Sequence, residues 1–159
     1  MAPLPTRYSQ RAPEALRGKL AIANARLAYE HYREVFSGAR WEYLVGKGAT
    51  PQRVLWASTS TKNPAYPDTL YVDELIGPDT VNTMPEETIA AYQQHGRPEP
   101  RLERDVEGAR QLLEDLRLAG VDYDDVTEVL EREGVEKFSD SFAELIGALA
   151  GKREQLAAA

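Results

Sequence analysis

The sequence predicts an α/β fold in which helices predominate around about two short parallel strands. Three observations lead to this prediction: apolar residues recur at helical spacing over most of the 159 residues, two short apolar runs interrupt them, and a helix lies between these runs. A strand, a helix and a second strand in this order are typical of a βα crossover, in which the strands run parallel. Because two strands cannot bury both faces and both edges of a parallel sheet, further strands are expected beside them.

The first third of the chain predicts an arm followed by two helices. Residues 1–12 are rich in proline and show no periodicity, so they are interpreted as an N-terminal arm or linker. From residue 13 onward, two apolar stripes at spacings of three and four predict a long, well-buried helix that ends at Ser37. A second, short helix is expected over about residues 40–45, where Trp41 is interpreted as a core anchor.

The middle of the chain carries both predicted strands. Residues 53–58 are apolar at their centre and polar at their ends, which is typical of a strand, with Trp56 as a core anchor. The proline-containing residues 59–68 predict a loop. Residues 69–76 are interpreted as a helix because start and stop signals flank them, and residues 80–84 as the second strand.

The last third predicts helices only. A helix begins near residue 85, where Thr83 and Glu86 have the spacing of a capping box. Apolar residues from Leu102 to Leu116 step by three and four, which predicts a strong amphipathic helix. Two further helices are expected: Asp122 caps the first, Gly134 stops it, and Ser139 opens the second.

Composition excludes several classes of function. The chain has 19 Lys and Arg against 26 Asp and Glu, a net charge of −7, which argues against a nucleic-acid partner. Its apolar runs are far shorter than the roughly 18 residues of a membrane span, and no secretory leader is recognisable. The absence of cysteine and the presence of only two histidines argue against a metal site, and the absence of cysteine favours a cytoplasmic location.

The loop after the first strand holds the strongest candidates for ligand binding. Ser58, Thr59 and two further hydroxyl residues precede Lys62, and four hydroxyls with one ammonium suit a phosphate or a sugar hydroxyl. The alternative is a polar loop whose hydroxyls only bond to nearby backbone. Lys62 could also act as a Schiff-base amine, but a polar loop supplies neither burial nor a cationic neighbour, so phosphate contact is preferred.

The end of the second strand holds a second candidate. Asn82 and Thr83 precede a helix whose N-terminus could attract an anion. A satisfied helix cap explains the same residues equally well. In parallel βα folds, the loops after the strands form the active face, so both loops are expected on the same side of the sheet.

Several segments of the chain together form a recognisable family pattern. They are QRVLWASTSTKNPAY at residues 52–66, DTLYV at 68–72 and VNTMP at 81–85, supported by GKLAIANA at 18–25 and by GVDY, EGV and KF between residues 120 and 138. These segments resemble transaldolase in its long actinobacterial form. The resemblance implies a transferase of aldehyde or ketone groups that moves a dihydroxyacetone unit between sugar phosphates in the pentose phosphate pathway. It implies a (β/α)8 TIM barrel, a lysine Schiff base and no cofactor.

The resemblance covers only part of such a barrel. A complete (β/α)8 barrel takes about 250 residues, and residues 13–156 are similar to its C-terminal half, so a partial barrel is expected. The family's Schiff-base lysine lies on an earlier strand in a Val-Lys-Ile-Pro-like context. No segment here matches that context, so no catalytic residue is assigned.

The resemblance also implies roles for the two loops. Ser58, Thr59 and Lys62 fall in the family's substrate and phosphate region, and Asn82 and Thr83 fall at the following strand end. Ser60 departs from the family pattern, which has glycine there. A Cβ at this position would matter if the loop needs a positive φ.

Two functions from different classes remain open at this point. The first is a transaldolase-family polypeptide that is catalytically incomplete alone, either truncated or half of a split enzyme. The second is a non-catalytic partner that docks another protein through the open barrel edge. Expected partners are a weakly bound sugar phosphate and an N-terminal half or a second copy, and no stable monomer is expected because the sheet edges are uncovered.

Overall fold

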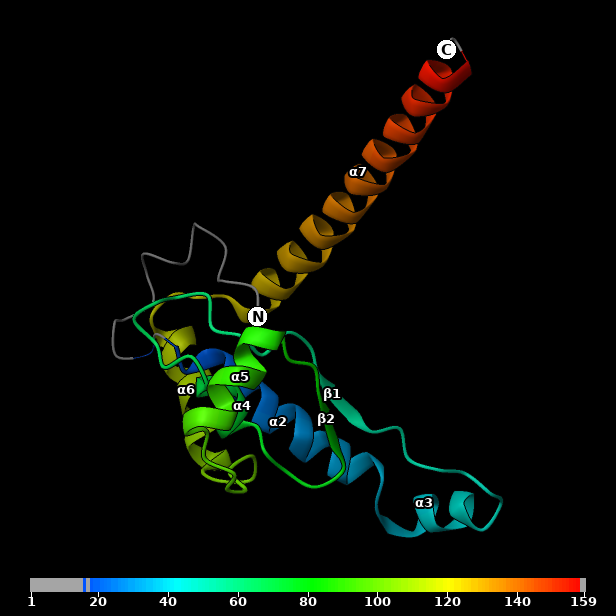
Figure 1. The fold of residues 1–159 in the computed structure, drawn as a ribbon. Helices are drawn as coiled ribbons and strands as arrows, with labels where there is room; N and C mark the ends of the chain where they lie inside the picture. The colour runs from blue at the N-terminus through cyan, green and yellow to red at the C-terminus, as the bar shows by residue number, and fades with distance from the viewer. Residues whose placement is uncertain (1–15, 17, 158–159) are drawn as a thin grey trace.

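The computed structural model describes Leu16 and residues 18–157, so the predicted arm at residues 1–12 lies outside the described part. Figure 1 shows most of the helices gathered beside a small sheet, with the last helix projecting away from them. The helix-rich α/β prediction is confirmed. The elements in chain order are α2 (Leu20–Val35), α3 (Gly38–Val45), β1 (Val54–Trp56), α4 (Leu70–Glu74), β2 (Thr80–Asn82), α5 (Glu86–His95), α6 (Val106–Leu118) and α7 (Tyr123–Ala157).

The sheet consists of two parallel strands, as the sequence predicts. Val54 lies opposite Thr80, and Trp56 lies opposite Asn82. The connection between the strands contains α4, which makes this segment the expected βα crossover. Only one face of the sheet is packed, because Trp56 is buried whereas Leu55, which points to the other face, stays 51% exposed.

The main core lies between α2, β1 and α4. Its buried side chains include Ile22, Tyr29, Trp56, Leu75 and Leu102. The one polar group of the Trp56 side chain is also satisfied inside this core, because its Nε1–H donates to the carbonyl oxygen of Leu75 at 3.2 Å. The prediction of Trp56 as a core anchor is confirmed, and this side chain fixes β1 against α4.

Ion pairs hold the helices together around this core. Glu74 of α4 binds two arginines, Arg26 of α2 at 2.8 Å and Arg101 at 3.1 Å. The hydrogen bond that Arg101 donates to Glu74 raises the pKa of the Arg101 guanidinium above its ordinary value. Two further ion pairs link α2 to the segment that enters α6 and to α6 itself: Arg33 with Glu103 and Glu30 with Arg110.

The predicted start of the amphipathic helix at Leu102 is wrong. α6 begins only after Asp105, whose side chain accepts a hydrogen bond from the Gly108 backbone at 3.1 Å. Leu102 is instead completely buried in the preceding turn, where its backbone N–H donates to the carbonyl of Ile76 at 3.0 Å. A Cβ on Gly77 would lie 2.6 Å from Cδ2 of Leu102, so glycine is required for this close approach.

The predicted break near Gly134 is also wrong, because α7 is one continuous helix of 35 residues. Glycine inside a helix lowers its stability by about 1 kcal/mol but does not end it. No described helix or strand packs against α7 at Gly134, so no tertiary contact ends the helix there. Asp122 does cap α7, accepting hydrogen bonds from the backbone of Asp124 and Asp125 at 3.1 and 3.2 Å. Neither α7 nor any other described helix is long and apolar enough to cross a membrane.

Candidate functional site

Four of the five predicted site residues meet at the carboxyl ends of the two strands. Thr59 Oγ1 donates to Asn82 Oδ1 at 2.7 Å. The Ser58 backbone N–H donates to Thr83 Oγ1 at 3.0 Å, and this hydroxyl donates in turn to the carbonyl of Trp56 at 3.0 Å. Parallel pairing therefore brings two loops that are distant in sequence into one hydrogen-bonded cluster.

The backbone of the first loop is strained at Ser58 and not at Ser60. Ser58 has a φ of 52°, in the left-handed region that serine rarely adopts, and Ser60 is not among the described residues with positive φ. Ser60 is instead buried, and its Oγ has no hydrogen-bond partner among the described residues. A buried hydroxyl is costly unless it is bonded, so this group is suited to bond a ligand oxygen or a water molecule.

The capping box predicted for Thr83 is wrong. α5 starts after Pro85 without a side-chain cap, because the Thr83 hydroxyl is used across the sheet on β1. The first turn of α5 also carries Glu86 and Glu87. Their negative charges oppose a bound anion at this helix N-terminus, so the structure favours neither sequence interpretation of it.

Lys62 lies further along the loop and is exposed. No hydrogen bond or ion pair within the described residues joins it to the other four predicted site residues. The loop around it is nevertheless closed, because Thr61 Oγ1 donates to the carbonyls of Pro67 and Asp68, both at 3.0 Å. Lys62 therefore extends from an anchored loop, with its ammonium in solvent.

A hydrogen bond that sequence analysis missed fastens this loop to α5. His95 Nε2 lies 2.8 Å from Asp68 Oδ1, and this hydrogen bond lowers the pKa of the Asp68 carboxyl below its ordinary value. The two residues are 27 positions apart, and no periodicity or motif links them. The contact becomes visible only when the crossover brings the end of α5 beside the loop.

Replacing His95 by alanine is therefore expected to raise the pKa of Asp68 toward its ordinary value of about 3.9. A carboxyl with a lowered pKa in the folded state stabilises the fold above its unfolded pKa, and this stabilisation is lost as the pH falls through the folded pKa. Carbon-13 NMR titration of the aspartate carboxyls measures the change. His31→Ala is the matched control, since His31 is exposed on α2, and an Asp68 pKa unaltered in His95→Ala would contradict the assignment.

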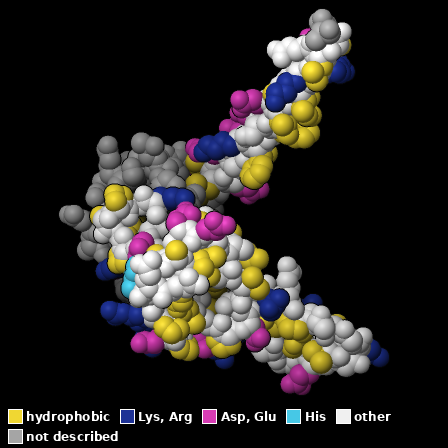
Figure 2. All heavy atoms as spheres, in the orientation of Figure 1, with side chains coloured by type: hydrophobic (Ala, Val, Ile, Leu, Met, Phe, Trp, Pro, Cys, Tyr) yellow, Lys and Arg dark blue, Asp and Glu magenta, His cyan; other side chains and the backbone are white. Residues whose placement is uncertain are grey.

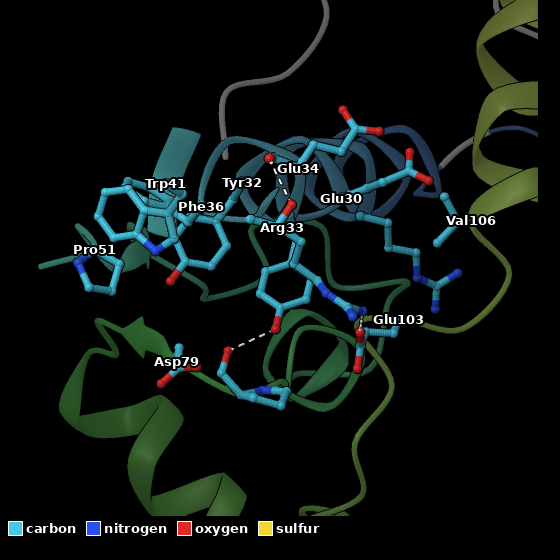
Figure 3. A pocket seen from close by; sticks show the side chains of 14 residues that line it. Glu30, Tyr32, Arg33, Glu34, Phe36, Trp41, Pro51, Asp79, Glu103 and Val106 are labelled. Carbon is cyan, nitrogen blue, oxygen red and sulfur yellow. Dashed lines mark hydrogen bonds and ion pairs between the residues drawn. The ribbon is translucent and has the colours of Figure 1, made fainter. Parts of the chain in front are cut away.

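A large groove lies at the opposite ends of the strands. Its volume is about 810 Å³, and Pro51 and Pro78, which line it, both precede a strand. Figure 3 shows Trp41 and Phe36 together along one wall, and their rings meet edge to face with centroids 4.7 Å apart. Trp41 thus lines this groove and is only partly buried, which corrects its prediction as a core anchor.

Two polar contacts join residues that line the groove. Tyr29 OH donates to the carbonyl of Pro78 at 3.0 Å, and Arg33 is paired with Glu103 (Figure 3). Burial is the main cause that raises the pKa of Tyr29. These contacts join α2 to the segments before β2 and α6, so the groove is a structural joint remote from the cluster at the carboxyl ends.

Comparison with known sequences identifies the family. The sequence model described as Transaldolase/Fructose-6-phosphate aldolase matches residues 4–149. The chain belongs to the transaldolase family. Among curated relatives, the transaldolase of Parafrankia sp. (strain EAN1pec) is 58% identical over 147 residues, and that of Frankia alni is 55% identical over 138 residues. Transaldolase 2 of Nostoc punctiforme is 49% identical over 141 residues.

The match to these transaldolases covers most of this chain but less than half of each relative. It includes 92%, 86% and 87% of this chain, but 39%, 37% and 37% of the respective relatives. The chain thus spans less than two fifths of the length of each. The resemblance seen in the sequence is confirmed at the level of the family.

Proposed function

We propose that the chain forms the C-terminal portion of a transaldolase barrel and supplies part of its sugar-phosphate site. The observation that carries this proposal is the cluster of Ser58, Thr59, Asn82 and Thr83 at the carboxyl ends of two neighbouring parallel strands. In (β/α)8 barrels, this is the end at which the loops form the active site. Together with family membership, the position of the cluster favours a catalytic face over a merely structural polar loop.

In this proposal, the chain does not perform the reaction alone. Dihydroxyacetone transfer in the family proceeds through a lysine Schiff base, and no Val-Lys-Ile-Pro-like segment is present here. More than half of each relative lies outside the match, and that remainder is proposed to carry the lysine. The half-exposed Leu55 on the open face of the sheet would then be covered by the rest of the barrel.

The residues of the cluster and of the adjoining loop have distinct proposed roles. Thr59 and Asn82 hold the two loops together, whereas the exposed ammonium of Lys62 contacts the phosphate. The buried hydroxyl of Ser60 donates to a sugar or phosphate oxygen, which satisfies a group left without a partner. Because a single exposed ammonium is screened by solvent, binding is expected only at about millimolar strength.

A second candidate function is a non-catalytic docking module, in which another protein occupies the open sheet. The observation that favours it is Leu55, which is 51% exposed on the unpacked face of the two-stranded sheet. Localisation in the cytoplasm remains a prediction under either function.

Sugar-phosphate binding distinguishes the two candidates. Titration of the chain with fructose 6-phosphate, followed by NMR, is expected to shift the amides of residues 58–63 and 82–83. Lys62→Ala is expected to weaken this binding several-fold, whereas Lys47→Ala, which removes an exposed ammonium from the segment that follows α3, leaves it unchanged. Shifts confined to other residues, or equal affinities in the two variants, would contradict the proposed site and favour the docking module.

A further inference from the structure

The projecting part of α7 carries a largely apolar seam. Along it, large side chains recur at alternating steps of three and four residues, which is the heptad spacing of a coiled coil. Phe138 is 82% exposed and Leu156 80%. Figure 1 shows α7 projecting from the part of the molecule that holds the sheet, α2 and α4 to α6, which is called the body below. Figure 2 shows hydrophobic side chains along the length of the helix. The apolar members of the seam are Val135, Phe138, Phe142, Leu145, Leu149 and Leu156.

This seam is not the face with which α7 packs against the body. Val126 and Val129, at the start of the helix, are buried, and Val126 packs with Leu116 and Val121 in a core separate from the main one. Val135 and Phe138 each come nine residues after one of these valines, which is two and a half helical turns and therefore about the opposite side. The body occupies one side of α7, and the seam lies on another.

The isolated helix needs a further surface for its stability. Gly134, Gly147 and Gly151 each weaken it by about 1 kcal/mol relative to alanine, and most helical stability in proteins comes from packing. The six apolar side chains of the seam are each between 54% and 82% exposed, so they form an apolar surface that a partner helix would bury. Seam and helix are therefore suited to a partner of matching length.

The charges along the seam select the partner and its direction. In the heptad register, Glu131 occupies a seam position before Val135, and Lys152 occupies one between Leu149 and Leu156. A parallel pair of α7 helices would place Glu131 against Glu131 and Lys152 against Lys152. An antiparallel pair places each Lys152 beside Val135 and within one layer of Glu131 of the other copy, where opposite charges attract.

We propose that α7 binds α7 of a second copy as an antiparallel coiled coil. Phe142 of each copy packs against Leu145 of the other, and Phe138 packs against Leu149, so the interface is self-complementary under two-fold symmetry. The positions that flank the centre of the seam are small or uncharged, including Ser139, Ser141 and Ala148, whereas Arg132 and Arg153 flank its two ends. The proposal goes beyond transaldolase chemistry and does not depend on it.

Sedimentation equilibrium at micromolar concentration tests the association. We expect a dimer for the native chain and a monomer for Phe142→Glu, with at least a tenfold weaker association. Ala143→Glu adds the same charge on the side of α7 away from the seam and is expected to remain dimeric. Leu55→Lys, which changes the open sheet face, is also expected to remain dimeric. Retained thermal unfolding of the body shows that each variant is folded.

Cross-linking tests the direction of the pair, and the chain has no native cysteine to interfere. A mixture of Val135→Cys and Lys152→Cys is expected to form a disulfide between the two variants on oxidation. Lys152→Cys alone is expected to form none, because its copies lie at opposite ends. A native monomer, a dimer that survives Phe142→Glu, a dimer dissociated by Leu55→Lys but not by Phe142→Glu, or efficient Lys152→Cys self-linkage would each overturn the proposal.

Discussion

The purified chain is expected to show no transaldolase turnover. A Schiff-base lysine needs a desolvated pocket or a cationic neighbour that keeps its amine reactive. All five lysines of the chain are exposed, including Lys62 in the candidate loop. Since the covalent intermediate splits the reaction into two feasible steps, its absence removes the pathway and does not merely slow it. Incubation with fructose 6-phosphate and borohydride should therefore leave no stable adduct on the chain.

Turnover is expected to appear when the missing segment is supplied. Co-expression with the unmatched portion of the Parafrankia transaldolase would provide the lysine and the remaining barrel strands. Thr83→Val in the present chain should then lower the restored rate, because the Thr83 hydroxyl holds both Ser58 and the end of β1. Lys47→Ala serves as the control. An adduct located by mass spectrometry on Lys62 of the chain alone would contradict the proposed division of labour.

Local sequence signals predicted the centre of the fold well. Proline and glycine punctuation separates β1, α4 and β2, and parallel pairing then follows from the helix between the strands. The same topology places Thr59 and Asn82 at one edge, so the predicted cluster formed from residues 23 positions apart. Chain direction alone sufficed for this part of the site.

Contacts that depend on tertiary packing could not be predicted in the same way. The Thr83 spacing indicated a capping box, but the hydroxyl had a competing acceptor on β1 that no local pattern reveals. Leu102 continued the helical spacing of α6, but its side chain is buried in the core against Gly77, where only a glycine leaves room for it. Gly134 indicated a helix end, but α7 continues through it because no described element packs there to end the helix. In each case, a long-range contact or its absence decided the outcome.

Trp56→Ala is expected to cause the largest loss of stability, about 3–5 kcal/mol, because it empties the centre of the main core. The substitution also leaves the Leu75 carbonyl without its indole donor, which costs roughly 1 kcal/mol of that total. Domains of this size have a total stability of about 5–15 kcal/mol. Urea unfolding followed by circular dichroism, at one fixed protein concentration, measures the change.

Trp41→Ala is the matched control for this prediction, because it removes the same side chain from the partly buried wall of the groove. There the indole contacts Phe36 at its edge, so a loss of only about 1–2 kcal/mol is expected. Trp56→Phe should fall between the two, since it keeps most of the packing and loses the hydrogen bond to Leu75. Equal losses for Trp41→Ala and Trp56→Ala would show that the core between α2, β1 and α4 does not govern the cooperative unfolding of the body.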